Sequence, residues 1–169
     1  ADSARLLRRR GQAMQRAVPI GDGAMAALLG ANFDLAEEIA RIAAGDGVCQ
    51  VANDNGGGQL VISGSSAAVG RAIEISKERG VKRAMLLPVS APFHCVLMQP
   101  AADEMAEALT DVAISESVIP VVANVTAAPV SDPEVCRVLL VEQVTKMVRW
   151  RESVLFMRDQ GVDKLVELG

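Results

Sequence analysis

Residues 48–63 read VCQVANDNGGGQLVIS, and this stretch decides the predicted fold of the first half of the chain. Two mainly apolar runs, Val48 to Ala52 and Gln59 to Ser63, flank a turn that is rich in asparagine and glycine. Both residue types favour tight turns because they tolerate left-handed backbone conformations. The pattern therefore predicts a β-hairpin, and a flexible turn is the simplest interpretation of Gly56 to Gly58.

Two helices and two further strands are predicted around this hairpin, namely a strand at 24–29, a helix at 34–44, a helix at 66–79 and a strand at 83–89. Asp34 and Glu37 have the spacing of an N-terminal cap and its reciprocal acid. The apolar run from Ala84 to Leu87 predicts that the last strand is buried. The order β-α-β-β-α-β is typical of the ferredoxin-like fold, so we predict a ferredoxin-like small subdomain over residues 23–88.

We predict that the remaining residues, 1–22 and 89–169, form parts of a larger α/β unit into which the small subdomain is inserted. Helices are predicted at 3–17, from Met98 to Val112, from Asp132 to about Lys146 and from Trp150 to Gly161, with strands at 120–125 and 162–168. The apolar run at 120–125 favours a buried parallel strand. The chain begins inside a helical pattern without a methionine, so we expect a fragment whose large unit lacks its first half.

Composition argues against several classes of protein. Half of the residues are apolar and 22% are charged, as in globular proteins, while a net charge of −4 and a pI near 5.1 argue against nucleic acid as a partner. Three cysteines without a Cys-x-x-Cys spacing favour a reducing cytoplasm over a disulfide framework or structural zinc. No apolar run approaches the roughly 18 residues of a membrane span, and neither end has the pattern of a signal peptide.

His94 is the only histidine in the chain, and it lies in the stretch PVSAPFHCVLM at 88–98. Two prolines end the preceding strand there, which places His94 where a strand gives way to a loop and a helix. A general base and a merely structural histidine are both open interpretations on this basis. Arg10 is the second candidate, because the spacing of Leu6, Arg10 and Met14 places a cation on an apolar helix face.

Other catalytic patterns are absent from the sequence or poorly supported. No two of the 14 glycines have the spacing of a Gly-x-Ser-x-Gly nucleophile elbow, and the glycine-rich dinucleotide and phosphate loops are missing too. Cys95 is disfavoured as a nucleophile paired with His94, because neighbouring side chains diverge in extended backbone. One histidine without clustered acids gives no support for a metal site.

Several blocks of sequence resemble the malonyl-CoA:acyl-carrier-protein transacylase family, in order and along nearly the whole chain. These blocks are Arg10–Pro19, Gly23–Ala27, Val51–Asn55, Gln59–Gly64, Leu87–Ala102, Val121–Val125 and Val148–Val154. The resemblance implies an α/β-hydrolase-like large subdomain and a serine-histidine acyltransferase of fatty acid biosynthesis. It also implies malonyl-CoA and acyl carrier protein as partners and no bound cofactor.

The resemblance also implies roles for individual residues. The position of His94 is that of the general base, with its second ring nitrogen held by a backbone carbonyl from the 148–150 stretch. Arg10 matches the arginine that binds the malonyl carboxylate, Met14 lines the same pocket, and Phe93 favours malonyl over branched acyl groups. The family's serine elbow is expected upstream of Ala1, so the chain as given is expected to form no acyl-enzyme.

Three alternatives remain open from the sequence. An acyltransferase domain of a polyketide or fatty-acid synthase shares the fold, although the block around Cys95 and the context of Arg10 look more like the free-standing enzyme. A non-catalytic fragment that binds carrier protein is the second alternative. A nucleic-acid-binding ferredoxin-like module is disfavoured by the acidic pI and by the absence of stacking aromatics in 48–64.

Overall fold

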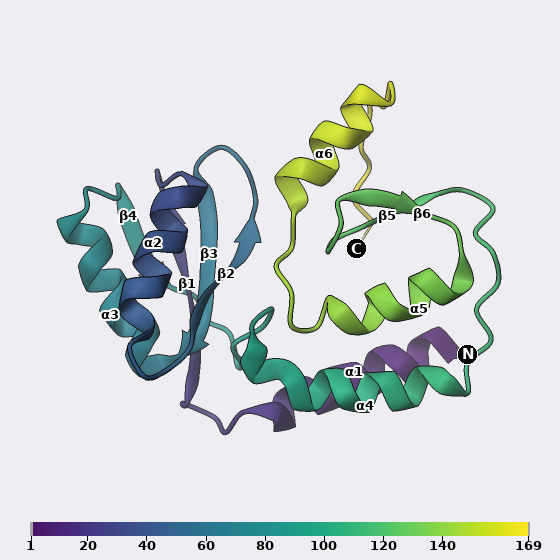
Figure 1. The fold of residues 1–169 in the computed structure, drawn as a ribbon, viewed down its shortest axis with the longest axis horizontal. Coiled ribbons are helices and arrows are strands. Elements are labelled where there is room, and N and C mark those ends of the chain that lie inside the picture. Colours follow the sequence, from purple (N-terminus) through teal and green to yellow (C-terminus); the bar gives the residue numbers. More distant parts are fainter. Residues whose placement is uncertain (1, 169) are drawn as a thin grey trace.

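The computed structural model describes residues 2–168 and arranges their elements in two groups that lie side by side (Figure 1). One group is a four-stranded sheet covered by two helices, and the other contains a pair of packed helices. The predicted mixed α/β class is confirmed. The first group consists of β1 (Gly23–Leu29), α2 (Phe33–Ala44), β2 (Cys49–Asp54), β3 (Gln59–Ser65), α3 (Ser66–Glu78) and β4 (Arg83–Leu86).

The predicted hairpin is present as the antiparallel pair β2 and β3. Two backbone hydrogen bonds close its turn: the Asn55 amide donates to the Gln59 carbonyl at 3.0 Å, and the Gln59 amide donates to the Gly56 carbonyl at 2.9 Å. Gly56, Gly57 and Gly58 all have positive φ angles, of 78°, 59° and 75°. Residues with a side chain rarely adopt this conformation, so the turn itself requires the glycine run.

The four strands follow the order β2-β3-β1-β4, and every neighbouring pair is antiparallel. The first and last strands of the group are hydrogen-bonded neighbours, with Ala26 opposite Leu86. The prediction of a buried last strand is wrong, because β4 lies at the edge of the sheet, ends at Leu86 and leaves that side chain 58% exposed. An edge strand has only one partner, and here that partner is β1.

Helices α2 and α3 pack on the sheet through small side chains, which allow close approach, and larger apolar residues fill the remaining space. The alanines of this core include Ala36, Ala40, Ala43, Ala68 and Ala72, and its larger members include Leu28, Ile39, Ile62 and Val69. The predicted cap of α2 by Asp34 and Glu37 is wrong. The Asn32 side chain accepts a hydrogen bond from the Leu35 amide at 2.9 Å instead, because Asn32 is extended and Asp34 already lies inside the helix.

The second group contains α1 (Asp2–Ala17), a short 3-10 helix η1 (Val96–Met98), α4 (Gln99–Thr110), β5 (Val121–Ala123), β6 (Ala128–Val130), α5 (Pro133–Glu142) and α6 (Trp150–Asp159). Helices α1 and α4 pack side by side around Met14, Met98 and Met105 (Figure 1). Arg9 and Arg16 of α1 both pair with Glu104 of α4 at 3.1 and 2.7 Å.

The predicted buried parallel strand at 120–125 is wrong in both respects. Its residues form β5, which pairs antiparallel with β6 in a two-stranded sheet, and Val121 is 51% exposed. A short turn returns the chain at once, with Ala127 at a positive φ of 52° and its amide bonded to the Ala123 carbonyl. An apolar run signals a strand but does not identify the partner with which the strand pairs.

Helix α5 begins as predicted, with the Asp132 side chain accepting hydrogen bonds from the amides of Glu134 and Val135. It ends at Glu142 rather than near Lys146, since residues 143–146 form turns. The predicted helix from Trp150 is confirmed as α6. The predicted strand at 162–168 is wrong: these residues are exposed and, within residues 2–168, pair with no other strand. Residues 1 and 169, the ends of the predicted large unit, lie outside the described residues.

Candidate active site

The four residues singled out from the sequence meet in one pocket. Arg10 and Met14 enter it from α1, and Phe93 and His94 enter from the loop that precedes η1. Gly11 and Gln15, the helical neighbours of Arg10 and Met14, complete the wall around a volume of about 260 Å³. A cation, an imidazole and apolar side chains from distant parts of the chain therefore share one small pocket.

Helix periodicity explains how α1 supplies its part of the pocket. Arg10 and Met14 are four residues apart, and so are Gly11 and Gln15, which places both pairs along one side of the helix. Met14 is 4% exposed and belongs to the core shared with α4, so its position is fixed by packing. Arg10 sits one turn away on the same fixed surface, and the core thereby aims the guanidinium into the pocket.

The Arg10 guanidinium has no hydrogen-bond or ion-pair partner among residues 2–168. Its Nε is buried without a hydrogen-bond acceptor, and no acid among residues 2–168 forms an ion pair with it. Burial lowers its pKa from the ordinary value, although an arginine so placed stays charged. A buried donor without a partner costs roughly 1–3 kcal/mol, which an anionic ligand would offset. The pocket thus has the properties of an anion site.

His94 has a strained backbone and a restrained side chain. Its φ angle is +58°, in the left-handed region that residues other than glycine seldom occupy, and such strain concentrates at functional sites. Ring atom Nδ1 lies 2.9 Å from the Gln143 carbonyl oxygen and 3.2 Å from that of Lys146. A carbonyl only accepts, so Nδ1 carries the hydrogen and Nε2 keeps its lone pair.

The expected backbone carbonyl is therefore present, but it comes from Gln143 and Lys146 rather than from 148–150. No carboxylate within residues 2–168 hydrogen-bonds the His94 ring. Burial is the main cause that lowers the pKa of His94, and the Arg10 charge lowers it further, whereas the two carbonyl contacts act in the opposite direction. Near neutral pH the ring is thus neutral and able to accept a proton at Nε2.

Several site features escaped prediction from the sequence. Gln15 borders the pocket, and its side-chain amide donates to the Ser90 hydroxyl on the opposite loop. A helical spacing of four from Gly11 is the signal that could have placed Gln15 there. The Gln143 and Lys146 carbonyls belong to the backbone, which every residue type shares, and so leave no signal in the sequence.

The remaining reactive groups have structural surroundings. Cys95 is buried, its Sγ donates to the Pro92 carbonyl at 3.2 Å, and burial raises its pKa, so its thiol is a poor nucleophile. Burial likewise raises the pKa of Cys49 to about 11. No cluster of three metal-ligating side chains occurs in the part of the chain that the structure describes. The same part contains no helix with the length and apolar character to cross a bilayer.

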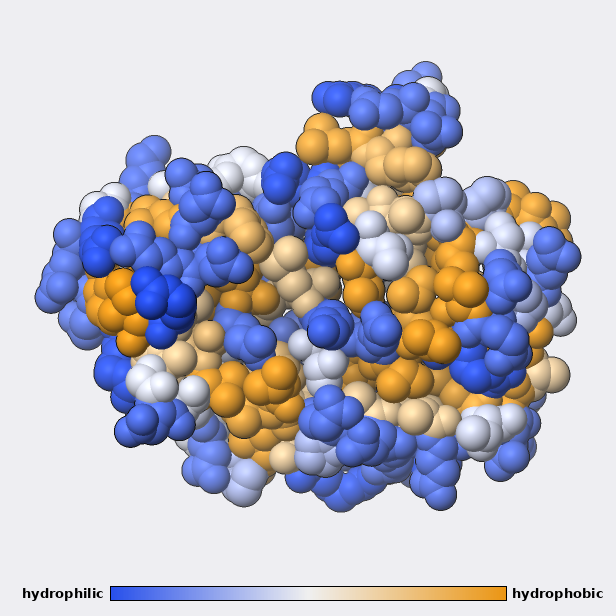
Figure 2. Space-filling view, viewed as in Figure 1, coloured by the Kyte–Doolittle hydropathy of each residue, from blue (hydrophilic) through white to orange (hydrophobic). Residues whose placement is uncertain are grey.

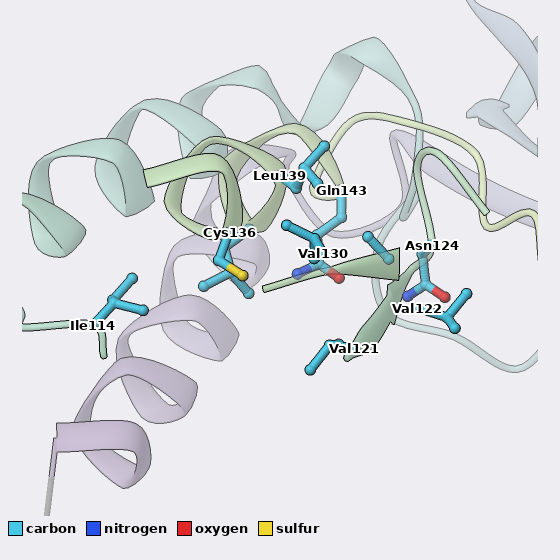
Figure 3. A pocket seen from close by; sticks show the side chains of 10 residues that line it. Ile114, Val121, Val122, Asn124, Val130, Cys136, Leu139 and Gln143 are labelled. Atoms are coloured by element: carbon cyan, nitrogen blue, oxygen red, sulfur yellow. The ribbon is translucent and has the colours of Figure 1, made fainter. Parts of the chain in front are cut away.

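A second, apolar pocket of about 330 Å³ lies beside the site, between α5 and the β5–β6 hairpin (Figure 3). Valines of the hairpin and Leu139 of α5 line it, and Gln143 stands in its wall. Apolar side chains also gather on the outer surface of this region (Figure 2), where Val138 and Leu140 of α5 are exposed. This pocket has no charged lining residue, so nothing in it suggests acid–base chemistry.

Comparison with known proteins places these features in a family. The family model described as "Acyl transferase domain" matches residues 1–169. The malonyl CoA-acyl carrier protein transacylase of Escherichia coli (strain K12) is 43% identical over 169 residues, which cover 100% of this chain and 55% of that protein. The chain thus spans about half the length of the curated relatives it matches.

Solved structures give the same result. The crystal structure of acyl-carrier-protein S-malonyltransferase from Bartonella henselae superposes with a TM-score of 0.96 at 55% identity, covering 99% of this chain and 54% of that one. A malonyl-transacylase solved in complex with a type II PKS acyl-carrier protein superposes with a TM-score of 0.95 at 41% identity, covering 98% and 53% of the two chains.

Proposed function

Because the chain belongs to the acyl transferase domain family, we propose that it supplies the general base and the carboxylate-binding arginine of a malonyl-CoA:acyl-carrier-protein transacylase. The observation that carries this proposal is that His94 shares one pocket with Arg10, whose guanidinium has no partner among residues 2–168. A neutral imidazole suits proton transfer, and a fixed guanidinium suits an acyl group that ends in a carboxylate.

The chemistry assigned to His94 is removal of a proton from a serine hydroxyl. As the serine oxygen attacks the malonyl thioester carbonyl, Nε2 takes the hydroxyl proton, and the departing coenzyme A thiolate then receives it. In the second half-reaction His94 takes the proton of the carrier protein's phosphopantetheine thiol, whose sulfur attacks the malonyl ester, and returns that proton to the serine oxygen. The serine is supplied by a nucleophile elbow, a motif absent from these 169 residues.

The role assigned to Arg10 is recognition of the malonyl carboxylate. A guanidinium can hold both carboxylate oxygens with two parallel hydrogen bonds, which a lysine ammonium cannot do. Met14 and Phe93 form the apolar part of the same pocket and would limit the width of the acyl chain. We assign them to substrate binding on this basis.

A finer description of the fold accompanies this proposal. We assign residues 23–88 to a ferredoxin-like small subdomain and residues 1–22 and 89–169 to parts of an α/β-hydrolase-like large subdomain. The antiparallel order β2-β3-β1-β4 supports the first assignment, and the helical pair α1–α4 with its separate core supports the division. We also propose a cytoplasmic location, to which the three free cysteines are suited.

Fatty acid biosynthesis is the pathway we propose, with a polyketide system as the second candidate. The second candidate is supported by the malonyl-transacylase that is similar to this chain and was solved in complex with a type II PKS acyl-carrier protein. The pocket fits either system, because the same malonyl group is transferred in both. Transfer rates to carrier proteins of the two kinds, compared at equal concentration, would separate them.

The test of the proposal is acyl-enzyme formation from malonyl-CoA, followed by intact-protein mass spectrometry. It uses the complete transacylase that carries residues 1–169, or a chimera that joins to them the unmatched segments of the Bartonella henselae transferase. We expect an added malonyl group in the complete protein and none in the 169-residue chain alone. Carrier-protein binding without acylation by the complete protein would support the non-catalytic alternative instead.

A further inference from the structure

We propose that the ion pair between Asp54 and Arg151 is a positioning device for His94. The pair fastens the segment 143–151 to the end of β2, and that segment supplies the two carbonyls that hold the His94 ring. Asp54 and Arg151 touch neither the imidazole nor the pocket, so their assigned role acts through the backbone. The proposal rests on the proposed function only in naming the reaction that it serves.

The first observation is a backbone connection between β2 and Val148. The Val148 amide donates to the Ala52 carbonyl at 2.8 Å, and the Asp54 amide donates to the Val148 carbonyl at 3.0 Å. Both β2 groups are free for this contact because β2 lies at the edge of the sheet and one of its sides has no partner strand among the described residues.

The second observation is the ion pair itself. Asp54 is buried, with 4% of its surface exposed, and its Oδ2 accepts a hydrogen bond from Arg151 Nε at 2.7 Å. Its Oδ1 accepts from the Gly56 amide at 3.2 Å, so the hairpin turn fixes the carboxylate. A buried carboxylate requires such partners, and loss of one of them is costly. Arg151 lies in the first turn of α6 and is therefore held at the place where the segment ends.

The third observation is that the segment is anchored on both sides of the Lys146 carbonyl. Val144 is fully buried in the core with α1 and α4, and Val148 is fixed to β2. The Lys146 carbonyl lies between these anchors, and the Gln143 carbonyl directly precedes Val144. Loosening the Val148 side would leave the Lys146 carbonyl held from one side only.

Two explanations of the pair predict different signs at His94. If Asp54 and Arg151 acted on the imidazole through their charges, removing the carboxylate would lower its pKa and removing the guanidinium would raise it. If they act through the segment, either removal weakens the carbonyl contacts and lowers the pKa. The charge that acts on the ring is that of Arg10 on α1, and it stays in place in the variants.

The experiment is nitrogen NMR of the His94 ring in the full 169-residue chain, whose single histidine makes the assignment unambiguous. The variants are Asp54→Asn and Arg151→Gln, with Arg151→Lys as the conservative change. Glu38→Gln is the matched control, because it removes the half-exposed ion pair with Arg79, which does not involve the segment. Circular dichroism verifies the fold, and Arg151 is exposed enough for its variants to fold even if Asp54→Asn does not.

We expect Asp54→Asn and Arg151→Gln each to lower the ratio of the Nδ1–H tautomer to the Nε2–H tautomer of His94 by about five-fold. This is the effect of losing one hydrogen bond. Both should lower the pKa of His94, and Arg151→Lys should restore part of each change. Unchanged tautomer ratios, or pKa changes of opposite sign, would overturn the proposal. This readout needs no acyl transfer, so failure of the proposed function and failure of the positioning role are separate outcomes.

Discussion

Nδ1 of His94 and the carbonyl oxygen of Gln143 are 2.9 Å apart, and this contact joins the loop before η1 to the end of α5. A neutral acceptor fixes the histidine tautomer as a carboxylate would, but it stabilises the protonated ring less. His94 therefore has its orientation without an acidic partner.

Replacing His94 with alanine in the complete transacylase should lower the rate of acylation by a factor on the order of 10² or more, because the serine loses its base. Stopped-flow or quench measurements with malonyl-CoA give this rate. Val96→Ala, at the exposed first residue of η1, is the control and should keep the parent rate. Parent-like acylation by the His94 variant would refute the assigned base.

The pH profile should follow the state of His94. Only the neutral ring accepts a proton, so acylation should fall as pH drops through its pKa, which lies below the ordinary value of about 6.5 because of burial and the Arg10 charge. Arg10→Met removes one of these causes and should raise the pKa. NMR titration of the 169-residue chain measures both values, and a lower pKa in the variant would contradict the assignment.

Arg10→Ala should reduce malonyl transfer strongly while sparing or improving acetyl transfer, since only the malonyl group carries a carboxylate. Arg10→Lys should recover part of the malonyl activity, because an ammonium supplies charge without the paired hydrogen bonds. Competition between malonyl-CoA and acetyl-CoA measures the ratio directly. Arg8→Ala changes an exposed arginine of the same helix and serves as the control. Equal losses on both substrates would remove the carboxylate-binding role.

Phe93 should limit the width of the acyl group. Phe93→Ala enlarges the pocket, so the ratio of methylmalonyl to malonyl transfer should rise, even if both rates fall. Parallel assays with the two coenzyme A esters provide the measurement. Phe33→Ala removes a phenylalanine that packs against the core of the four-stranded sheet, and it controls for general loss of stability. An unchanged ratio would show that Phe93 does not contact the substituent.

Gly64 and Gly70 provide a matched pair for stability. A Cβ on Gly64 would lie 1.9 Å from the Val48 carbonyl oxygen, so Gly64→Ala should cost about 3 kcal/mol or more by forcing β2 and β3 apart. Gly70 lies in α3 with open space around its Cβ position, and Gly70→Ala should stabilise the chain by about 1 kcal/mol. Urea unfolding curves measure both values, and a stable Gly64→Ala variant would contradict the structure.

The parts predicted well are those that local sequence determines. The Asn53–Gly58 turn and the stripe of Arg10 and Met14 depend on backbone preference and helix periodicity, and both are present. The strand with which a given strand pairs is not determined locally. An apolar run such as 120–125 pairs according to contacts made elsewhere in the fold. The acceptors of His94 are backbone atoms, whose positions only the folded chain reveals.

The pairing of β1 with β4 has a consequence for how this architecture can vary. The Leu87 amide donates to the Met25 carbonyl at 2.9 Å, so the chain enters and leaves the four-stranded sheet at neighbouring points. The chain between these two points returns to where it started, so its two covalent connections to the rest of the protein lie side by side, next to Gly23 and Pro92. Recombination between homologues could therefore exchange residues 23–88 while the spacing of Arg10 and His94 is preserved. Chimeric chains that exchange residues 23–88 could therefore be joined at these two neighbouring connections.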